Sequence, residues 1–104
     1  MPAVTPDALL DELEGQDPPM VIDARTPREY AEGHLEGALH LPVDDLRDRL
    51  DEIPRDRRIA VYCAGGYRSY VAQQLLKHRG FEDVRNVLGG YDLLDRVMRL
   101  RRRA

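Results

Sequence analysis

The sequence is nearly free of cysteine and has no long apolar run. Cys63 is the only cysteine among 104 residues, so the chain cannot form an internal disulfide or resolve an oxidised thiol by itself. No apolar stretch approaches the roughly 20 residues that span a bilayer. Residues 1–7 lack the basic and apolar regions of a signal peptide. We therefore expect a cytoplasmic protein, kept in a reducing compartment and without a membrane partner.

An excess of one charge is also missing. The net charge is −3, and 42% hydrophobic residues with 34% charged residues are typical of a globular chain. This balance predicts no general attraction to nucleic acid or to anionic lipid. Lysine is almost absent, because 15 of the 16 basic residues are arginine, and five of these fall between Arg96 and Arg103. We interpret this end as a solvated helix, with a docking surface for an acidic protein as the alternative.

Short apolar runs alternate with helical patterns along the whole chain. Short apolar runs predict strands at 20–22, 38–41 and 58–62, and a fourth strand is expected at 83–87. Helices are expected near 5–15, 26–33, 44–54, 69–79 and 89–100. The strands are mostly short apolar runs rather than alternating ones, as in strands that are buried on both faces. The pattern predicts one α/β domain over residues 1–104, with a mostly parallel central sheet of about five strands and helices on both faces.

Helix start signals support this assignment. Thr5 before Pro6 is a good N-cap, and Thr26 with Glu29 forms a capping box. Asp44 or Asp45 is expected to cap the third helix, which Pro54 closes.

Cys63 stands where an apolar strand gives way to a glycine loop and then to a helix. Because ligands of parallel sheets bind beyond the carboxyl ends of the strands, Asp23, Cys63 and the Gly89-Gly90 turn are expected to share one rim. Amides at a helix N-terminus favour a thiolate, and Gly65 and Gly66 allow successive amides to turn inward.

Arg68 adds a permanent positive charge that suits an oxyanion. The pattern therefore predicts a nucleophilic Cys63 with an anionic substrate, and the alternative is a cysteine that only packs in the core. The three histidines show no metal-ligand spacing with Cys63, and no nucleotide-binding motif is present. We expect no metal and no cofactor.

Three segments resemble the rhodanese family of sulfurtransferases. The segment 61–69, Val-Tyr-Cys-Ala-Gly-Gly-Tyr-Arg-Ser, is similar to the active-site motif of that family. Residues 21–25 with 29–38 resemble a second motif, and residues 88–91 a third. The loop is most similar to those of rhodanese domains fused to coenzyme A-disulfide reductases or to persulfide dioxygenases. Neither partner domain is present in this chain.

The resemblance implies a single-domain, three-layer rhodanese fold and a thiosulfate sulfurtransferase-like enzyme. Cys63 would take a sulfane sulfur from thiosulfate or a persulfide and form a cysteine persulfide. A thiol, a cyanide-like acceptor or a sulfur-accepting protein would remove it. The substrate-binding residues would be those of the loop, namely Ala64, Gly65, Gly66, Tyr67, Arg68 and Ser69. Asp23 and Arg25 are charges at a strand end, so we expect them to pair with each other or with the cysteine loop and to brace the site rather than to do chemistry.

Two other functions remain as alternatives. One is a sulfur-carrier or sensing module with little turnover, docked on a partner protein. The other is a phosphatase of the same fold, but such enzymes resemble this chain less, because their loop holds five residues between cysteine and arginine. Here there are four, residues 64–67. His34 is interpreted as a turn residue with a local hydrogen bond rather than as a catalytic group.

Overall fold

One sheet of five parallel strands forms the centre of the protein. The computed structural model describes residues 2–103, and the strand order is β1-β5-β4-β2-β3. The strands are β1 (Ala3–Val4), β2 (Met20–Asp23), β3 (Leu39–His40), β4 (Ile59–Tyr62) and β5 (Val84–Val87). The predicted α/β fold with a parallel sheet is confirmed, and Cys63 directly follows the central strand β4.

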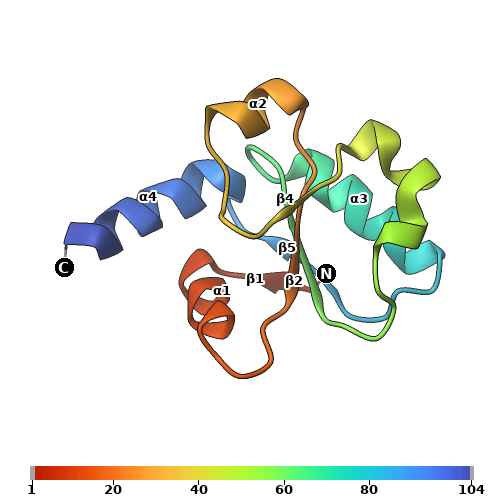
Figure 1. Ribbon diagram of the computed structural model, residues 1–104, viewed down its shortest axis with the longest axis horizontal. Coiled ribbons are helices and arrows are strands. Elements are labelled where there is room, and N and C mark those ends of the chain that lie inside the picture. The colour runs from red at the N-terminus through yellow and green to blue at the C-terminus, as the bar shows by residue number, and fades with distance from the viewer. Residues whose placement is uncertain (1, 104) are drawn as a thin grey trace.

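Helices cover both faces of this sheet. The helical elements are α1 (Pro6–Leu13), α2 (Pro27–Glu32), the 3₁₀ segment η1 (Val43–Glu52), α3 (Tyr67–His78) and α4 (Gly90–Arg103). In Figure 1, α1 and α4 lie on one side of the strands, η1 and α3 lie on the other, and α2 lies at the top. No helix described within residues 2–103 is both long and apolar enough to cross a bilayer.

Each face of the sheet has its own apolar core. Ile22 and Val61 pack with η1 and α3, whereas Val21 and Ala60 pack with α1 and α4. Neighbouring strand residues point to opposite faces, so each strand must be apolar on both of them. This is why the central strands read as continuous apolar runs.

The helix start signals at Thr5 and Thr26 are confirmed. The Thr5 hydroxyl oxygen accepts from the Ala8 amide at 3.1 Å, and Thr26 and Glu29 form both bonds of a capping box. Strand β1 was not predicted, because two residues are too few to make an apolar run. Its pairing with β5 defines it instead, through the Leu88 amide, which donates to the Val4 carbonyl at 2.9 Å.

The segment after β3 corrects a prediction. Neither Asp44 nor Asp45 caps it: the segment η1 follows Pro42, has no side-chain cap and leaves helical geometry at Arg49, where φ is −126°. Leu46 and the flanking Ile53 are buried all the same. Long 3₁₀ helices are uncommon, so a break within this segment is expected. The course of the segment therefore depends on the burial of these apolar side chains rather than on a continuous helix.

Candidate active site

The carboxyl ends of the strands bring the predicted rim together. The Tyr91 amide, at the start of α4, donates to the Cys63 carbonyl at 2.7 Å, and the Asp92 amide donates to the Ala64 carbonyl at 3.1 Å. Gly90 permits this approach, because a Cβ at that position would collide with the backbone of Cys63 and Ala64. Helix α4 therefore holds the cysteine loop against the sheet.

The Cys63 sulfur lies inside its loop and accepts hydrogen bonds from it. The residue is 2% exposed. The Gly66 amide points at Sγ at 3.1 Å, and the Ser69 hydroxyl lies 3.4 Å from it. Gly66 has a φ of 121°, which favours glycine, and this turn directs its amide inward.

These contacts favour the thiolate of Cys63. Burial raises the pKa of the thiol, but hydrogen bonds from the Ser69 side chain and from the amides of Ser69, Gly66 and Gly65 together lower it further. The net effect is a pKa below the ordinary value. A thiolate is the nucleophilic form of cysteine, so the geometry suits nucleophilic chemistry.

Arg68 makes a two-pronged ion pair with Glu29 of α2. Its Nη1 and Nη2 donate to the two carboxylate oxygens at 2.7 and 2.9 Å. The hydrogen bond from Arg68 is the largest cause that lowers the pKa of Glu29 to about 2. The same bond, more than the nearby Cys63 sulfur, raises the pKa of Arg68. Glu29 thus holds the arginine beside the loop and offsets its charge.

Asp23 and Arg25 pair with each other behind the loop. Arg25 donates to both Asp23 oxygens and, at 2.6 Å, to the Gly33 carbonyl. Burial lowers the pKa of Arg25, but the hydrogen bond to Asp23 and its charge raise it more. The Arg25 guanidinium lies 4.2 Å from the centre of the Tyr91 ring. Since Tyr91 holds the Cys63 carbonyl, this buried pair connects to the loop through α4.

Tyr67 opens onto a groove at the mouth of the loop. Its side chain is 78% exposed and lines a groove of about 410 Å³. The other walls come from η1 and α3 and include Val43, Arg47, Arg68 and Val71. A more polar recess on the opposite side of the loop is lined by Ala64, Arg25 and Asp92.

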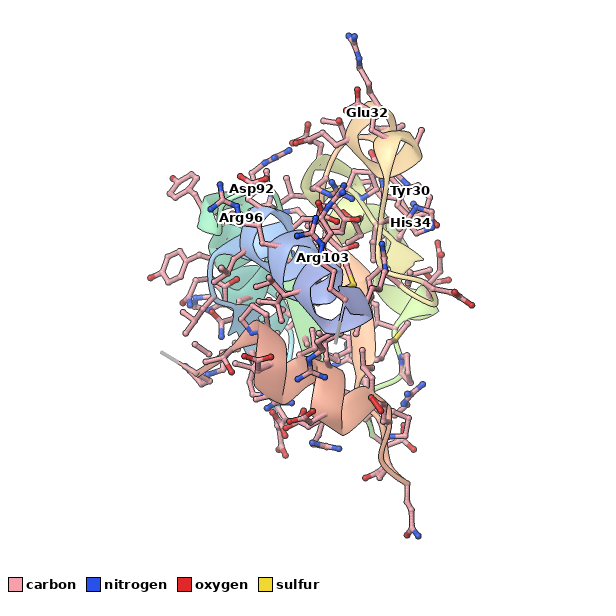
Figure 2. The ribbon with its side chains drawn as sticks, turned by 90° about the vertical axis from the view of Figure 1, so that its left-hand side faces the viewer. Tyr30, Glu32, His34, Asp92, Arg96 and Arg103 are labelled. Atoms are coloured by element: carbon pink, nitrogen blue, oxygen red, sulfur yellow. The ribbon has the colours of Figure 1, made fainter. Side chains whose placement is uncertain are left out.

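His34 and the arginines near the end of the chain lie outside the cysteine loop. Figure 2 shows Tyr30 and His34 next to one another; their rings stack at 3.7 Å, and His34 Nδ1 lies 2.9 Å from the Tyr30 carbonyl oxygen. This local contact agrees with the turn role predicted for His34. Arg96 and Arg103 project from α4 in the same view. Within residues 2–103, no group of three or more potential metal ligands is present.

Two residues that contact members of the predicted site were not identified from the sequence. Asn86 of β5 lies 2.6 Å from the Ser69 hydroxyl, and the Tyr62 hydroxyl donates to Asp23 at 2.7 Å. A polar residue between the valines of a predicted strand is the one signal that could have pointed to Asn86. Glu29 was recognised as a capping residue and as part of the second motif, but not as the partner of Arg68.

Comparisons with known proteins place these features in context. The family model described as "Rhodanese-like domain" matches residues 5–95. A sulfurtransferase of Allochromatium vinosum is 38% identical over 81% of this chain and 78% of its own length. A tRNA uridine(34) hydroxylase of Erwinia tasmaniensis is 36% identical over 81% of this chain, which corresponds to 25% of its own length. The crystal structure of reduced Bacillus anthracis CoADR-RHD has a TM-score of 0.87 and 36% identity, over 97% of this chain and 18% of that one.

Proposed function

The chain belongs to the rhodanese-like domain family, and we propose that it is a sulfurtransferase that carries a sulfane sulfur on Cys63. The observation that supports the proposal best is the surrounding of the sulfur. The Gly66 amide and the Ser69 hydroxyl contact Sγ, and together with the amides of Gly65 and Ser69 they lower the thiol pKa despite burial. A lowered pKa increases the fraction of thiolate, and the thiolate needs no general base to attack.

The proposed reaction has two steps. The Cys63 thiolate attacks the outer sulfur of thiosulfate, a sulfur–sulfur bond forms on Cys63, the sulfur–sulfur bond of thiosulfate breaks, and sulfite leaves with its electron pair. Cyanide or a thiolate then attacks the outer sulfur of the persulfide and regenerates the Cys63 thiolate. The inward amides of the loop would stabilise the anionic persulfide, and Arg68 would attract the anionic donor.

The groove beside Tyr67 offers room for a larger donor or acceptor. Its volume of about 410 Å³ lies in the range of small-molecule sites and far exceeds the needs of thiosulfate. We propose that it holds the organic part of a persulfide donor or of a thiol acceptor. The hydroxylase relatives share only a quarter of their length with this chain. Their substrate is therefore not assigned to this chain. Thiolate chemistry of this kind suits the cytoplasm.

Mass measurement after incubation with thiosulfate tests the loading step. We expect one added sulfur atom on the wild-type protein and none on Cys63→Ser. Adding cyanide should then release thiocyanate with repeated turnover. Loading without turnover would favour the alternative, a carrier or sensing module that acts on a partner protein. If thiosulfate and glutathione persulfide both fail to load Cys63, sulfur transfer is the wrong function.

A further inference from the structure

The Ser69 hydroxyl lies near three acceptors but can donate only one hydrogen bond. Its oxygen lies 2.6 Å from Asn86 Oδ1, 3.2 Å from the Gly66 carbonyl oxygen and 3.4 Å from Cys63 Sγ. A serine hydroxyl carries one proton, so it can donate fully to only one of these atoms at a time. The shortest contact is the one with Asn86.

The position of Asn86 follows from the sheet. Asn86 pairs in register with Val61, two residues before Cys63, and lies two residues after Val84. Alternate strand residues share a face, and Val84 packs in the core that includes α3 residues. The Asn86 side chain therefore faces α3, where Ser69 lies in the first turn of the helix.

The Gly66 carbonyl determines which way the Asn86 amide points. Nδ2 of Asn86 donates to this carbonyl oxygen at 3.2 Å, which leaves Oδ1 directed at Ser69. The reversed amide would place Oδ1 against the Gly66 oxygen, and two acceptors would then face each other. Asn86 is thereby held as an acceptor for the Ser69 proton.

We propose that Asn86 is a positioning residue for Cys63. Its Oδ1 accepts the hydrogen bond of the Ser69 hydroxyl whenever the sulfur is not an anion, and the hydroxyl donates to Sγ instead when the thiolate forms. This inference rests on the proposed function, because it describes how Asn86 acts when Cys63 is a free thiolate and when it is a persulfide.

The hydroxyl rotates as the charge on sulfur changes. With a thiolate, the Ser69 proton points at Sγ. Once the persulfide forms, the negative charge resides on the outer sulfur, and the Ser69 hydroxyl again donates its hydrogen bond to Asn86 Oδ1. Asn86 thus favours the loaded state over the free thiolate. No bond other than a hydrogen bond changes in this rearrangement.

A substitution at Asn86 does not alter the other charged groups around the loop. Arg68 comes from α3, Glu29 from α2, Asp92 from α4, and the pair of Asp23 with Arg25 lies behind the loop. Substitutions at Asn86 leave all of them in place, so a change in the behaviour of Cys63 reports on the path through Ser69.

The pKa of Cys63 can be measured without any sulfur donor. Labelling with cysteine enriched in ¹³C at Cβ gives a single signal, because the chain has one cysteine, and its shift is followed against pH. We expect Asn86→Ala to lower the pKa and to raise the ratio of thiolate to thiol about tenfold at a given pH, since Ser69 then donates to Sγ without competition. Asn86→Asp should raise the pKa, because a carboxylate retains the Ser69 proton and repels the thiolate. If Asn86→Ala fails to fold, Asn86→Leu removes the acceptor and fills the space.

A double-mutant cycle separates this path from a general effect on the loop. In a Ser69→Ala background, Asn86→Ala should leave the Cys63 pKa unchanged. With Ser69 present, Asn86→Ala should also slow loading by thiosulfate several-fold above the pKa, because a more stabilised thiolate is less nucleophilic. An unchanged pKa in Asn86→Ala, or an equal shift with and without Ser69, would overturn the proposal. Failure of wild-type protein to load sulfur, with the pKa shifts intact, would instead count against the proposed function.

Discussion

At the scale of single residues, the site depends on side chains that serve two purposes. Glu29 caps α2 through Thr26 and also binds Arg68 with both carboxylate oxygens. Ser69 lies in the first turn of α3 and also contacts the Cys63 sulfur. In both cases a side chain near the start of a helix also contacts a residue of the cysteine loop, so a substitution there changes the local structure and the site together.

The first prediction concerns the pH dependence of stability. Because the pKa of Glu29 falls from 4.5 to about 2 on folding, its contribution is complete above about pH 4.5 and is lost as the pH falls towards 2. The pair is about one-third exposed, so we expect Glu29→Gln to lower the free energy of unfolding by about 1 kcal/mol at pH 6 and by almost nothing at pH 2. Urea unfolding at several pH values measures this difference.

The matched control is Glu32→Gln, which changes an exposed carboxyl at the end of the same helix. It should leave stability unchanged at both pH values. Glu29→Gln should also lower the KM for thiosulfate, because it removes the anion that competes for Arg68. A stability loss that is equal at pH 6 and pH 2 would show that the ion pair is not its source.

At the scale of elements, the contact between the start of α4 and the cysteine loop positions the site. The sheet brings the ends of β4 and β5 side by side, and Tyr91 and Asp92 use the first amides of α4 to bind the carbonyls of the loop. These amides have no partner within the helix, so the loop supplies one. The third motif is therefore part of the site although it offers no side chain to the sulfur.

Gly90→Ala tests this contact. Gly90 has a φ of 61°, and a Cβ there would also meet the backbone of Cys63 and Ala64. We expect a loss of more than about 2 kcal/mol in the free energy of unfolding, and slower loading of Cys63 by thiosulfate. Gly37→Ala is the control, because Gly37 has a φ of 87° but no atom within 4 Å of the position that an added Cβ would take.

The control should lose only the backbone term of about 1 kcal/mol and should load sulfur at the wild-type rate. Equal effects of the two substitutions on loading would mean that the α4 contact does not position the cysteine. Thermal or urea unfolding, together with mass measurement of loading, gives both results.

At the scale of the whole molecule, the groove forms only when η1 and α3 pack together. Val43, Asp44 and Arg47 come from η1, whereas Tyr67, Arg68, Val71 and Leu75 come from α3. Arg68 belongs both to the groove and to the loop around Cys63. A molecule in the groove would therefore contact Arg68 and Tyr67 of the segment that follows Cys63.

Val71→Asp tests the proposed role of the groove. Val71 is 41% exposed, so the substitution should have little effect on folding. We expect kcat/KM for glutathione persulfide to fall about tenfold, because a charge replaces apolar contact area, while the value for thiosulfate changes by less than about twofold. Leu100→Asp, on exposed α4 surface far from the groove lining, is the control. Parallel losses with both donors would place the effect on Cys63 rather than on the groove.

Much of the fold could be predicted from local patterns. The runs at β2 and β4 are apolar on both faces, and Thr5 and Thr26 cap helices through bonds within a few residues. Strand β1 and η1 could not be predicted in this way. Strand β1 exists because β5 pairs with it, and the course of η1 depends on the burial of Leu46 and Ile53.

The amino-acid sequence by itself determined the position of Cys63 after a strand, the two glycines that follow it in the chain and the spacing from Cys63 to Arg68. These features depend only on neighbours along the chain. Only the tertiary structure decided the partners of those residues. Glu29 lies 39 positions from Arg68 and Asn86 lies 17 from Ser69. Such contacts depend on how strands order themselves in the sheet and on which helix face each strand end meets, and no local pattern specifies either.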